Sequence, residues 1–201
     1  MPPPRHRRSI LAIALLAIGC GASFGPADAS APRDPRWAEP LAVAGLPNLA
    51  RIEPDLYRGA QPEPAGFAAL RDMGMKTIID LRKDHSDRGD VAAAGLPEGA
   101  FDLVAIPTLA SRVGVGDVRA FLAVAADPAK RPLFFHCKHG ADRTGAMAAA
   151  YRVVVQGWTP DDAIAEMTGG GFGFHAIFRG LPELVAALPA AALRAELGPT
   201  R

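Results

Sequence analysis

The chain has 201 residues, of which 49% are hydrophobic and 21% charged, and its formal net charge at pH 7 is +1. This length and composition are enough for one globular domain with a sizeable core. The balanced charge argues against a broad basic surface, so nucleic-acid binding and other non-specific polyanion binding are excluded as main functions.

The first 29 residues have the pattern of a secretory signal peptide. Basic residues within 5–8 precede an apolar run over 10–18, and small residues at 27–29 offer a cleavage point before Ser30. The apolar run is shorter than the roughly 20 residues that a membrane-spanning helix needs. We therefore expect a periplasmic or secreted protein, which would meet a membrane only if the signal stays uncleaved or Cys20 is lipidated.

The mature chain divides into an arm and one domain. Residues 30–48 are rich in proline, which predicts a tether or an ordered arm, with Trp37 able to dock it on the domain. No repeat or second boundary interrupts residues 49–201, so we expect a single domain there.

Hydrophobic periodicity within this domain alternates between strand and helix. In chain order it predicts strand structure over 49–58, a helix over 63–73, strands over 76–81 and 101–106, a helix over 117–126, a strand over 132–136, and helices over 145–155, 159–167, 175–187 and 190–197. This order predicts an α/β fold in which helices flank both faces of a central, mostly parallel sheet. A functional site is expected at the carboxyl end of a strand.

Residues 137–143 are expected to form a tight turn between the strand over 132–136 and the helix over 145–155. Backbone amides in such a turn, together with the positive end of the helix, favour an anion at its centre. The same field favours the thiolate form of Cys137, which is the nucleophilic form. Six positions later, Arg143 offers a planar fork that fits two phosphoryl oxygens. The turn therefore predicts a phosphate site with a nucleophile.

Other residues of the turn, and the two residues that follow it, are expected to line the phosphate. They are Lys138, His139, Gly140, Ala141, Thr144 and Gly145. Gly140 is expected in a crowded or positive-φ position, and the Thr144 hydroxyl is placed to donate toward the Cys137 sulfur. Lys138 and His139 either add positive charge for a polyanionic substrate or form an exposed loop without selectivity.

No metal site is predicted. His136, Cys137 and His139 are too close in sequence to supply four tetrahedral ligands, and the mature chain has no second cluster of cysteine and histidine. We expect His136 to point away from the cysteine and to anchor the turn by hydrogen bonds.

The segment resembles the His-Cys-x5-Arg-Ser/Thr-Gly signature of cysteine-dependent tyrosine and dual-specificity phosphatases. The matching positions are His136, Cys137, Arg143, Thr144 and Gly145. Residues 57–62 and 74–82 are similar to the opening of bacterial members, so the resemblance covers about residues 49–190.

The resemblance implies a dual-specificity phosphatase-like fold and hydrolysis of phosphomonoesters, of the phosphotyrosine or dual-specificity type, through a phosphocysteine intermediate and without a cofactor. A substrate that is an inositol phosphate or phosphoinositide, in place of a phosphoprotein, is the alternative within the enzyme class. A catalytically silent phosphate-binding module is the alternative outside it.

The general acid departs from the usual pattern of these phosphatases. Most relatives carry an aspartate on a separate loop about thirty residues before the cysteine, yet residues 104–116 contain no carboxylate. Asp142 is one substitute, although it could equally cap the following helix or orient Arg143. Asp117, Asp84 and Asp87 are further candidates, for which a helix start and a solvated loop are the simpler interpretations.

Three further residues have open roles. His175 follows a glycine-rich segment over 169–174 and could position the hydrolytic water, or the segment could be a plain connector. Arg58 and Gln61 either border the pocket or brace the phosphate turn.

Overall fold

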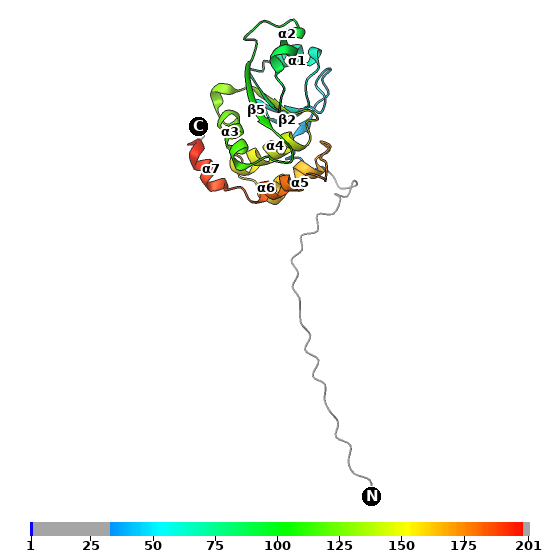
Figure 1. Ribbon diagram of the computed structural model, residues 1–201, viewed down its shortest axis with the longest axis vertical. Coiled ribbons are helices and arrows are strands. Elements are labelled where there is room, and N and C mark those ends of the chain that lie inside the picture. The colour runs from blue at the N-terminus through cyan, green and yellow to red at the C-terminus, as the bar shows by residue number, and fades with distance from the viewer. Residues whose placement is uncertain (2–32, 199–201) are drawn as a thin grey trace.

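The computed structural model describes Met1 and residues 33–198 (Figure 1). The predicted signal peptide, with Cys20, lies outside the described residues. Among the described residues, no helix is both long and apolar enough to cross a bilayer.

One mixed sheet forms the centre of the structure. Its strands are β1 (Glu39–Pro40), β2 (Ala50–Glu53), β3 (Leu56–Gly59), β4 (Thr77–Arg82), β5 (Asp102–Thr108) and β6 (Leu133–His136). Their spatial order is β1-β2-β3-β6-β4-β5. Strands β3, β6, β4 and β5 are parallel neighbours, whereas β1, β2 and β3 pair antiparallel. The prediction of a mostly parallel central sheet is therefore confirmed.

Helices cover both faces of this sheet. They are α1 (Pro64–Asp72), α2 (Asp87–Ala93), α3 (Val115–Ala125), α4 (Asp142–Val154), α5 (Pro160–Gly169), α6 (Gly180–Ala186) and α7 (Ala190–Leu197). In Figure 1, α1 and α2 lie above the sheet, α3 and α4 lie below it, and α5 and α6 lie beyond α4.

Strand alternation explains the two cores. Successive side chains of a strand point to opposite faces, so neighbouring residues of one strand belong to different clusters. Ile78 packs with Phe67 of α1 on one face, and Ile79 packs with Phe121 of α3 and Met147 of α4 on the other. Burial on both faces accounts for the consecutive apolar residues Ile78–Ile79 of β4 and Leu133–Phe135 of β6.

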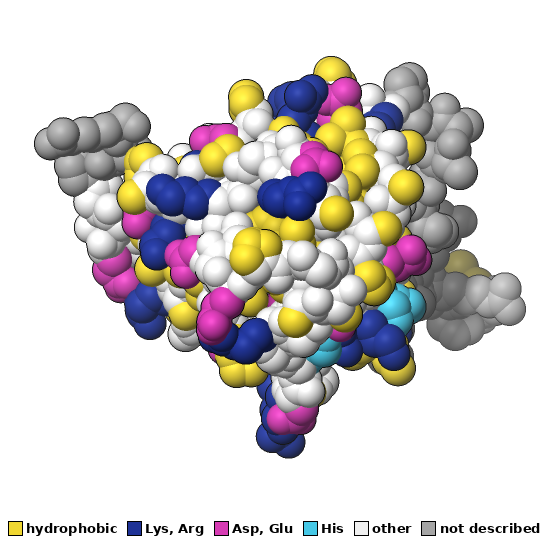
Figure 2. All heavy atoms as spheres, turned by 90° about the horizontal axis from the view of Figure 1, so that it is seen from above, with side chains coloured by type: hydrophobic (Ala, Val, Ile, Leu, Met, Phe, Trp, Pro, Cys, Tyr) yellow, Lys and Arg dark blue, Asp and Glu magenta, His cyan; other side chains and the backbone are white. Residues whose placement is uncertain are grey.

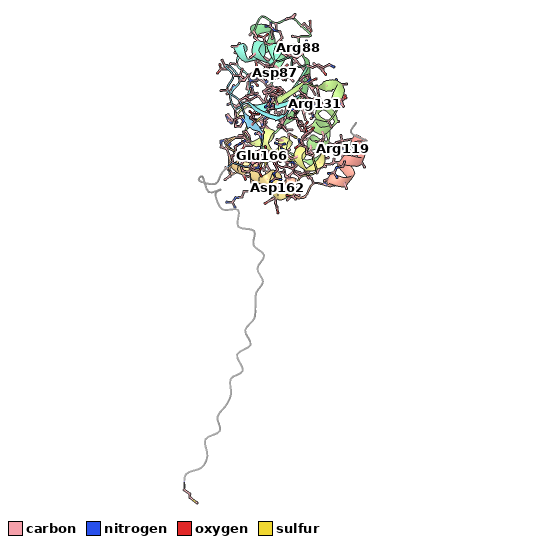
Figure 3. The ribbon with its side chains drawn as sticks, turned by 180° about the vertical axis from the view of Figure 1, so that it is seen from behind. Asp87, Arg88, Arg119, Arg131, Asp162 and Glu166 are labelled. Atoms are coloured by element: carbon pink, nitrogen blue, oxygen red, sulfur yellow. The ribbon has the colours of Figure 1, made fainter. Side chains whose placement is uncertain are left out.

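Residues 33–48 of the expected arm are ordered and pack on the domain. β1 adds an edge strand to the sheet, and Ala38 and Leu46 are buried. The backbone N–H of Ala38 donates to Glu166 Oε1 at 2.5 Å, and Arg152 forms a bidentate pair with the same carboxylate at 2.7 and 2.9 Å. Glu166 lies in the lower helical layer, away from Asp87 (Figure 3). A buried ion pair thus fixes the arm to α5.

One helix was missed, and two others begin at residues different from those expected. Sequence reasoning missed α2, whose start is capped by the Ser86 hydroxyl and which buries Asp87 and Val91. α4 begins at Asp142 rather than 145, so the end of the phosphate turn is already helical. α6 begins only at Gly180, because residues 176–177 form a turn and the backbone N–H of His175 is bonded to Asp142.

Candidate active site

The segment after β6 forms a loop over residues 137–141 that leads into α4. Strand β6 lies between β3 and β4, with His136 level with Gly59 on one side and Asp80 on the other. The loop therefore leaves the middle of the sheet and packs against the ends of both neighbours. Cys137, its first residue, is 2% exposed.

Gly140 has the positive φ that the sequence analysis expected, at +67°. A Cβ at this position would lie 2.6 Å from Ala60 N and from the carbonyl carbon of Gly59. Both atoms belong to the backbone and cannot rotate away, so only glycine fits here without displacing the loop.

Arg58 of β3 supports the loop from beneath. Its side chain is fully buried, and Nη2 donates to the Gly140 carbonyl at 2.7 Å. The guanidinium lies 3.9 Å from the ring centre of Phe172. Burial lowers the pKa of Arg58 to about 10, although the charges of Glu166 and Cys137 act in the opposite direction. This contact identifies Arg58 as a brace for the loop.

Arg143 is held by the ends of two strands. Its Nη1 donates to the carbonyl oxygens of Leu81, at 3.2 Å, and Thr108, at 3.1 Å. Within the described chain these are the hydrogen bonds of the guanidinium, so its Nε and Nη2 donors are available to an anion. A fork fixed in this way can bind two phosphoryl oxygens without first being ordered.

His136 anchors the loop to α2. Its Nε2 lies 2.8 Å from Asp87 Oδ2, with both side chains buried, and its ring stacks on Phe134. Burial alone would raise the pKa of Asp87, but hydrogen bonds from His136 and Gln61 outweigh it and lower that pKa. Asp87 is therefore ionised and occupied by His136, which does not suit a proton donor.

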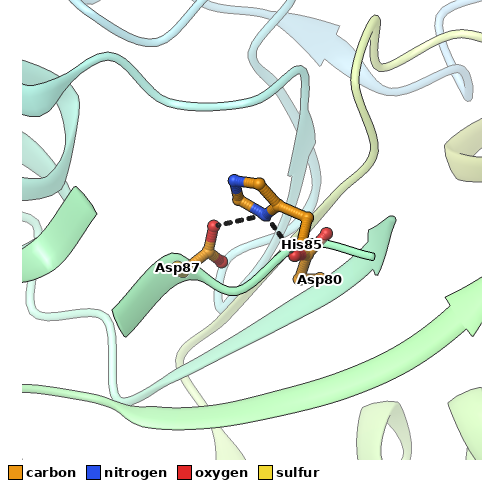
Figure 4. A group of neighbouring side chains, drawn as sticks. All are labelled: Asp80, His85 and Asp87. Atoms are coloured by element: carbon orange, nitrogen blue, oxygen red, sulfur yellow. Dashed lines mark hydrogen bonds and ion pairs between the residues drawn. The ribbon is translucent and has the colours of Figure 1, made fainter. Parts of the chain in front are cut away.

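Asp80 and His85 extend this network. Figure 4 shows His85 between Asp80 and Asp87, with Nδ1 at 2.7 Å from Asp80 Oδ2 and 3.7 Å from Asp87 Oδ1. One ligand-type atom of each residue lies within 4.8 Å of the others, a spacing that could suit a cation. The carboxylates already accept hydrogen bonds from Arg82 N, Gln61 and His136. The cluster thus forms a bonded network that links α2 to the loop.

The other candidate acids differ in their surroundings. Asp117 Oδ2 accepts the backbone N–H of Gly114 at 2.9 Å, which explains it as a helix-start residue of α3. Asp84 is exposed, has a φ of +56° and lies 4.0 Å from Lys83. Asp142 is 6% exposed, and its carboxylate accepts hydrogen bonds from both the backbone N–H and Nδ1 of His175.

The remaining residues predicted to line the phosphate differ in their exposure. Lys138 and His139 are exposed, whereas Ala141 and Gly145 are buried. The Thr144 hydroxyl is buried and has no hydrogen-bond partner within the described chain, so its donation to the sulfur stays a prediction.

Sequence reasoning missed Asn48, whose Nδ2 donates to the carbonyl oxygens of His139 and Phe172, each at 3.0 Å. Its φ is +55°, a backbone conformation that cannot be read from the sequence.

A family model described as "DSP-PTPase phosphatase fused to NAD+ Kinase" matches residues 48–177, a range that includes Cys137 and Arg143. The chain belongs to the dual-specificity phosphatases. This phosphatase is 41% identical over 167 residues to Dual specificity protein phosphatase TpbA of Pseudomonas aeruginosa strain UCBPP-PA14, across 83% of this chain and 73% of TpbA.

Solved structures agree with this assignment. A crystal structure of P. aeruginosa TpbA, with a cysteine replaced by serine and in complex with pTyr, superimposes with a TM-score of 0.69. The two chains are 36% identical, and the match covers 83% of this chain and 98% of the other. Inositol diphosphatase DSP5 of Arabidopsis thaliana is 25% identical over 123 residues, which is 60% of each protein. The predicted fold, family and enzyme class are therefore confirmed.

Proposed function

We propose that this phosphatase hydrolyses phosphomonoesters through a phosphocysteine intermediate on Cys137. The thiolate attacks phosphorus, the ester P–O bond breaks, and the leaving oxygen takes a proton. Water then attacks phosphorus, the S–P bond breaks, and inorganic phosphate and the thiolate are released. Arg143 and the loop amides bind the phosphoryl oxygens in both steps.

The position of Arg143 carries this proposal. Carbonyl oxygens at the ends of β4 and β5 fix one side of its guanidinium, in the same first turn of α4 that follows the Cys137 loop. A planar fork in the first turn of the helix that follows a buried thiol is suited to stabilise the charge of a phosphoryl group during its transfer.

We propose phosphotyrosine-type substrates as the first class. Two large apolar side chains of the described domain are exposed, Leu109 at 42% and Ile177 at 82%, and each lies close in the chain to a residue that contacts α4. Leu109 follows Thr108, which binds Arg143, and Ile177 follows the Asp142 partner His175 by two residues. Exposed apolar groups suit contact with a peptide and its aromatic leaving group better than contact with a polyanion.

Inositol phosphates form the second class. Lys138 and His139 are exposed in the loop and would add positive charge for a polyanion, and the similarity to DSP5 points the same way. On the face that Figure 2 presents, positive and negative side chains are interspersed and form no broad basic field.

Parallel assays separate these alternatives. We would measure phosphate release from a phosphotyrosine peptide and from an inositol diphosphate, with reduced protein and with Cys137→Ser as the control. Loss of release in the variant supports cysteine-dependent hydrolysis, and the preferred substrate assigns the class. Absence of release from both, in a folded reduced protein, would favour the phosphate-binding module.

We also propose that the protein is exported, as residues 1–29 indicate. The mass of the exported protein tests this proposal, because cleavage before Ser30 and lipidation at Cys20 give different masses. Retention of the whole chain in the cytoplasm would contradict it.

A further inference from the structure

The phosphatase needs a proton donor that the expected loop does not supply. Residues 104–116, which end β5 and lead into α3, contain no carboxylate. An ester whose leaving oxygen is strongly basic is cleaved slowly unless that oxygen is protonated as the bond breaks. Of the four aspartates considered, Asp87 is bonded to His136 and Asp84 is exposed. Asp117 accepts a backbone N–H at the start of α3.

Asp142 lies closest to the loop in sequence, but both of its oxygens are engaged. Oδ1 accepts the backbone N–H of His175 at 2.9 Å and lies 3.1 Å from Nδ1 of the same residue. Oδ2 lies 2.9 Å from Nδ1. Two donors from one residue fix the carboxylate at the start of α4, which suits an orienting anion better than a group that must deliver a proton.

Within the part of the chain that the structure describes, the side-chain nitrogen of this pair that makes no hydrogen bond is Nε2 of His175. Because Nδ1 faces Asp142, that atom carries the hydrogen and Nε2 lies on the opposite side of the ring. The His175 side chain is 52% exposed. Its ring centre is 6.0 Å from that of His139 in the phosphate loop and 6.3 Å from that of Phe178. The titratable groups that face His175 are therefore Asp142 of α4 and His139 of the loop.

We propose that His175, oriented by Asp142, is the proton donor and acceptor of the reaction. This inference rests on the proposed function. In the imidazolium form, Nδ1–H stays bonded to Asp142, and Nε2–H gives its proton to the leaving oxygen as the S–P bond forms and the P–O bond breaks. The neutral Nε2 then takes a proton from water as the water oxygen attacks phosphorus and the S–P bond breaks. The proton balance closes, since the imidazolium and the thiolate are both restored.

A comparison of two leaving groups tests the role of His175 in the full-length protein. A phosphotyrosine peptide needs a proton donor, whereas 2,4-dinitrophenyl phosphate releases a stable anion without one. We expect His175→Gln to lower kcat on the peptide about 10²-fold or more. On the dinitrophenyl ester the variant should keep the rapid first turnover, seen as a burst of one dinitrophenolate per enzyme, because only the later hydrolysis of phosphocysteine needs the base.

Two further variants make the test specific. Asp142→Asn should show the same dependence on leaving group, with a smaller loss of kcat and an unchanged KM. The reason is that Asp142 orients the His175 ring and does not touch substrate. Phe178→Leu removes the neighbouring ring but no proton, and both esters should react as in the wild type.

The outcomes separate this inference from the proposed function. An equal loss of the first turnover on both esters would show that His175 only supports the loop, and no loss on the peptide would show that it is not the donor. Either result overturns the inference alone. If the wild type gave no burst and matched Cys137→Ser, the proposed function would fall, and the inference with it.

Discussion

Gly140→Ala tests the claim that the phosphate loop is shaped by its contact with β3. Alanine would have to adopt a φ of +67°, which costs about 1–2 kcal/mol for a residue with a Cβ. Its methyl group would also meet the backbone of Gly59 and Ala60 at 2.6 Å, and such overpacking costs typically about 1–3 kcal/mol. The two costs together predict a loss of about 3 kcal/mol, or about 6–12 °C in Tm for a domain of this size.

Gly99→Ala is the matched control. Gly99 has a φ of +82°, but a Cβ there would meet nothing within 4 Å, so only the backbone cost of about 1–2 kcal/mol applies. Thermal unfolding of the two variants therefore isolates the effect of the close contact. The Gly140→Ala variant should also lower kcat/KM at least about tenfold, because displacing the loop by a fraction of an ångström would misplace the Cys137 sulfur. Equal Tm values for the two variants, or unchanged kcat/KM in Gly140→Ala, would refute this account of the loop.

Three other predictions concern buried charges. Glu166→Ala should destabilise the protein by about 3–5 kcal/mol in urea denaturation, because it leaves Arg152 buried without its charge partner. The control Glu196→Ala removes the exposed pair with Arg119 and should change the unfolding free energy little. Similar losses in both variants would contradict the role of burial. Asp87→Asn should cost about 2–3 kcal/mol at pH 7. Because the folded-state pKa of Asp87 is lowered, its contribution to stability is present above the unfolded pKa of about 3.9 and is lost as pH falls through the folded pKa. Urea denaturation should therefore show that the difference in unfolding free energy between variant and wild type closes below about pH 4. A difference that stays constant with pH would contradict this. Arg58→Met should lower kcat/KM more than about tenfold by freeing the Gly140 carbonyl. It should change stability by less than about 1 kcal/mol, because Nε and Nη1 of Arg58 are buried without partners among the described residues. A large fall in Tm with normal kcat/KM would reverse this assignment.

Local chemistry explains why the fold class and the centre of the site were predictable. Successive side chains of the strand over 132–136 pack into two different cores, and its run of consecutive apolar residues indicates this burial on both faces. Likewise, Cys137 and Arg143 belong to one turn and the helix that follows it, so their spacing alone places them together. Short-range rules of this kind need no knowledge of the rest of the chain.

The missed and displaced elements depended on distant contacts. α2 has seven residues and two acidic groups in its first turn, which resembles a solvated loop until Asp87 meets His136, 49 positions away. The segment before α6 carries a helical pattern, but the bonds from His175 to Asp142 hold its start in a turn. Propensity is too weak to decide such cases, because one buried charged hydrogen bond outweighs the preferences of several residues.

By itself, the sequence determined the fold class and the placing of Cys137 and Arg143 around one loop, because each depends on residues within one turn or one strand. Only the tertiary structure decided how these groups are held. Arg58 reaches Gly140 across 82 positions, and Asp142 meets His175 across 33. Such pairs arise when separate strands and helices pack, and many partners in the sequence could have formed them. The physical reason is that side-chain hydrogen bonds are short and directional, so the packed geometry alone selects which donors meet which acceptors.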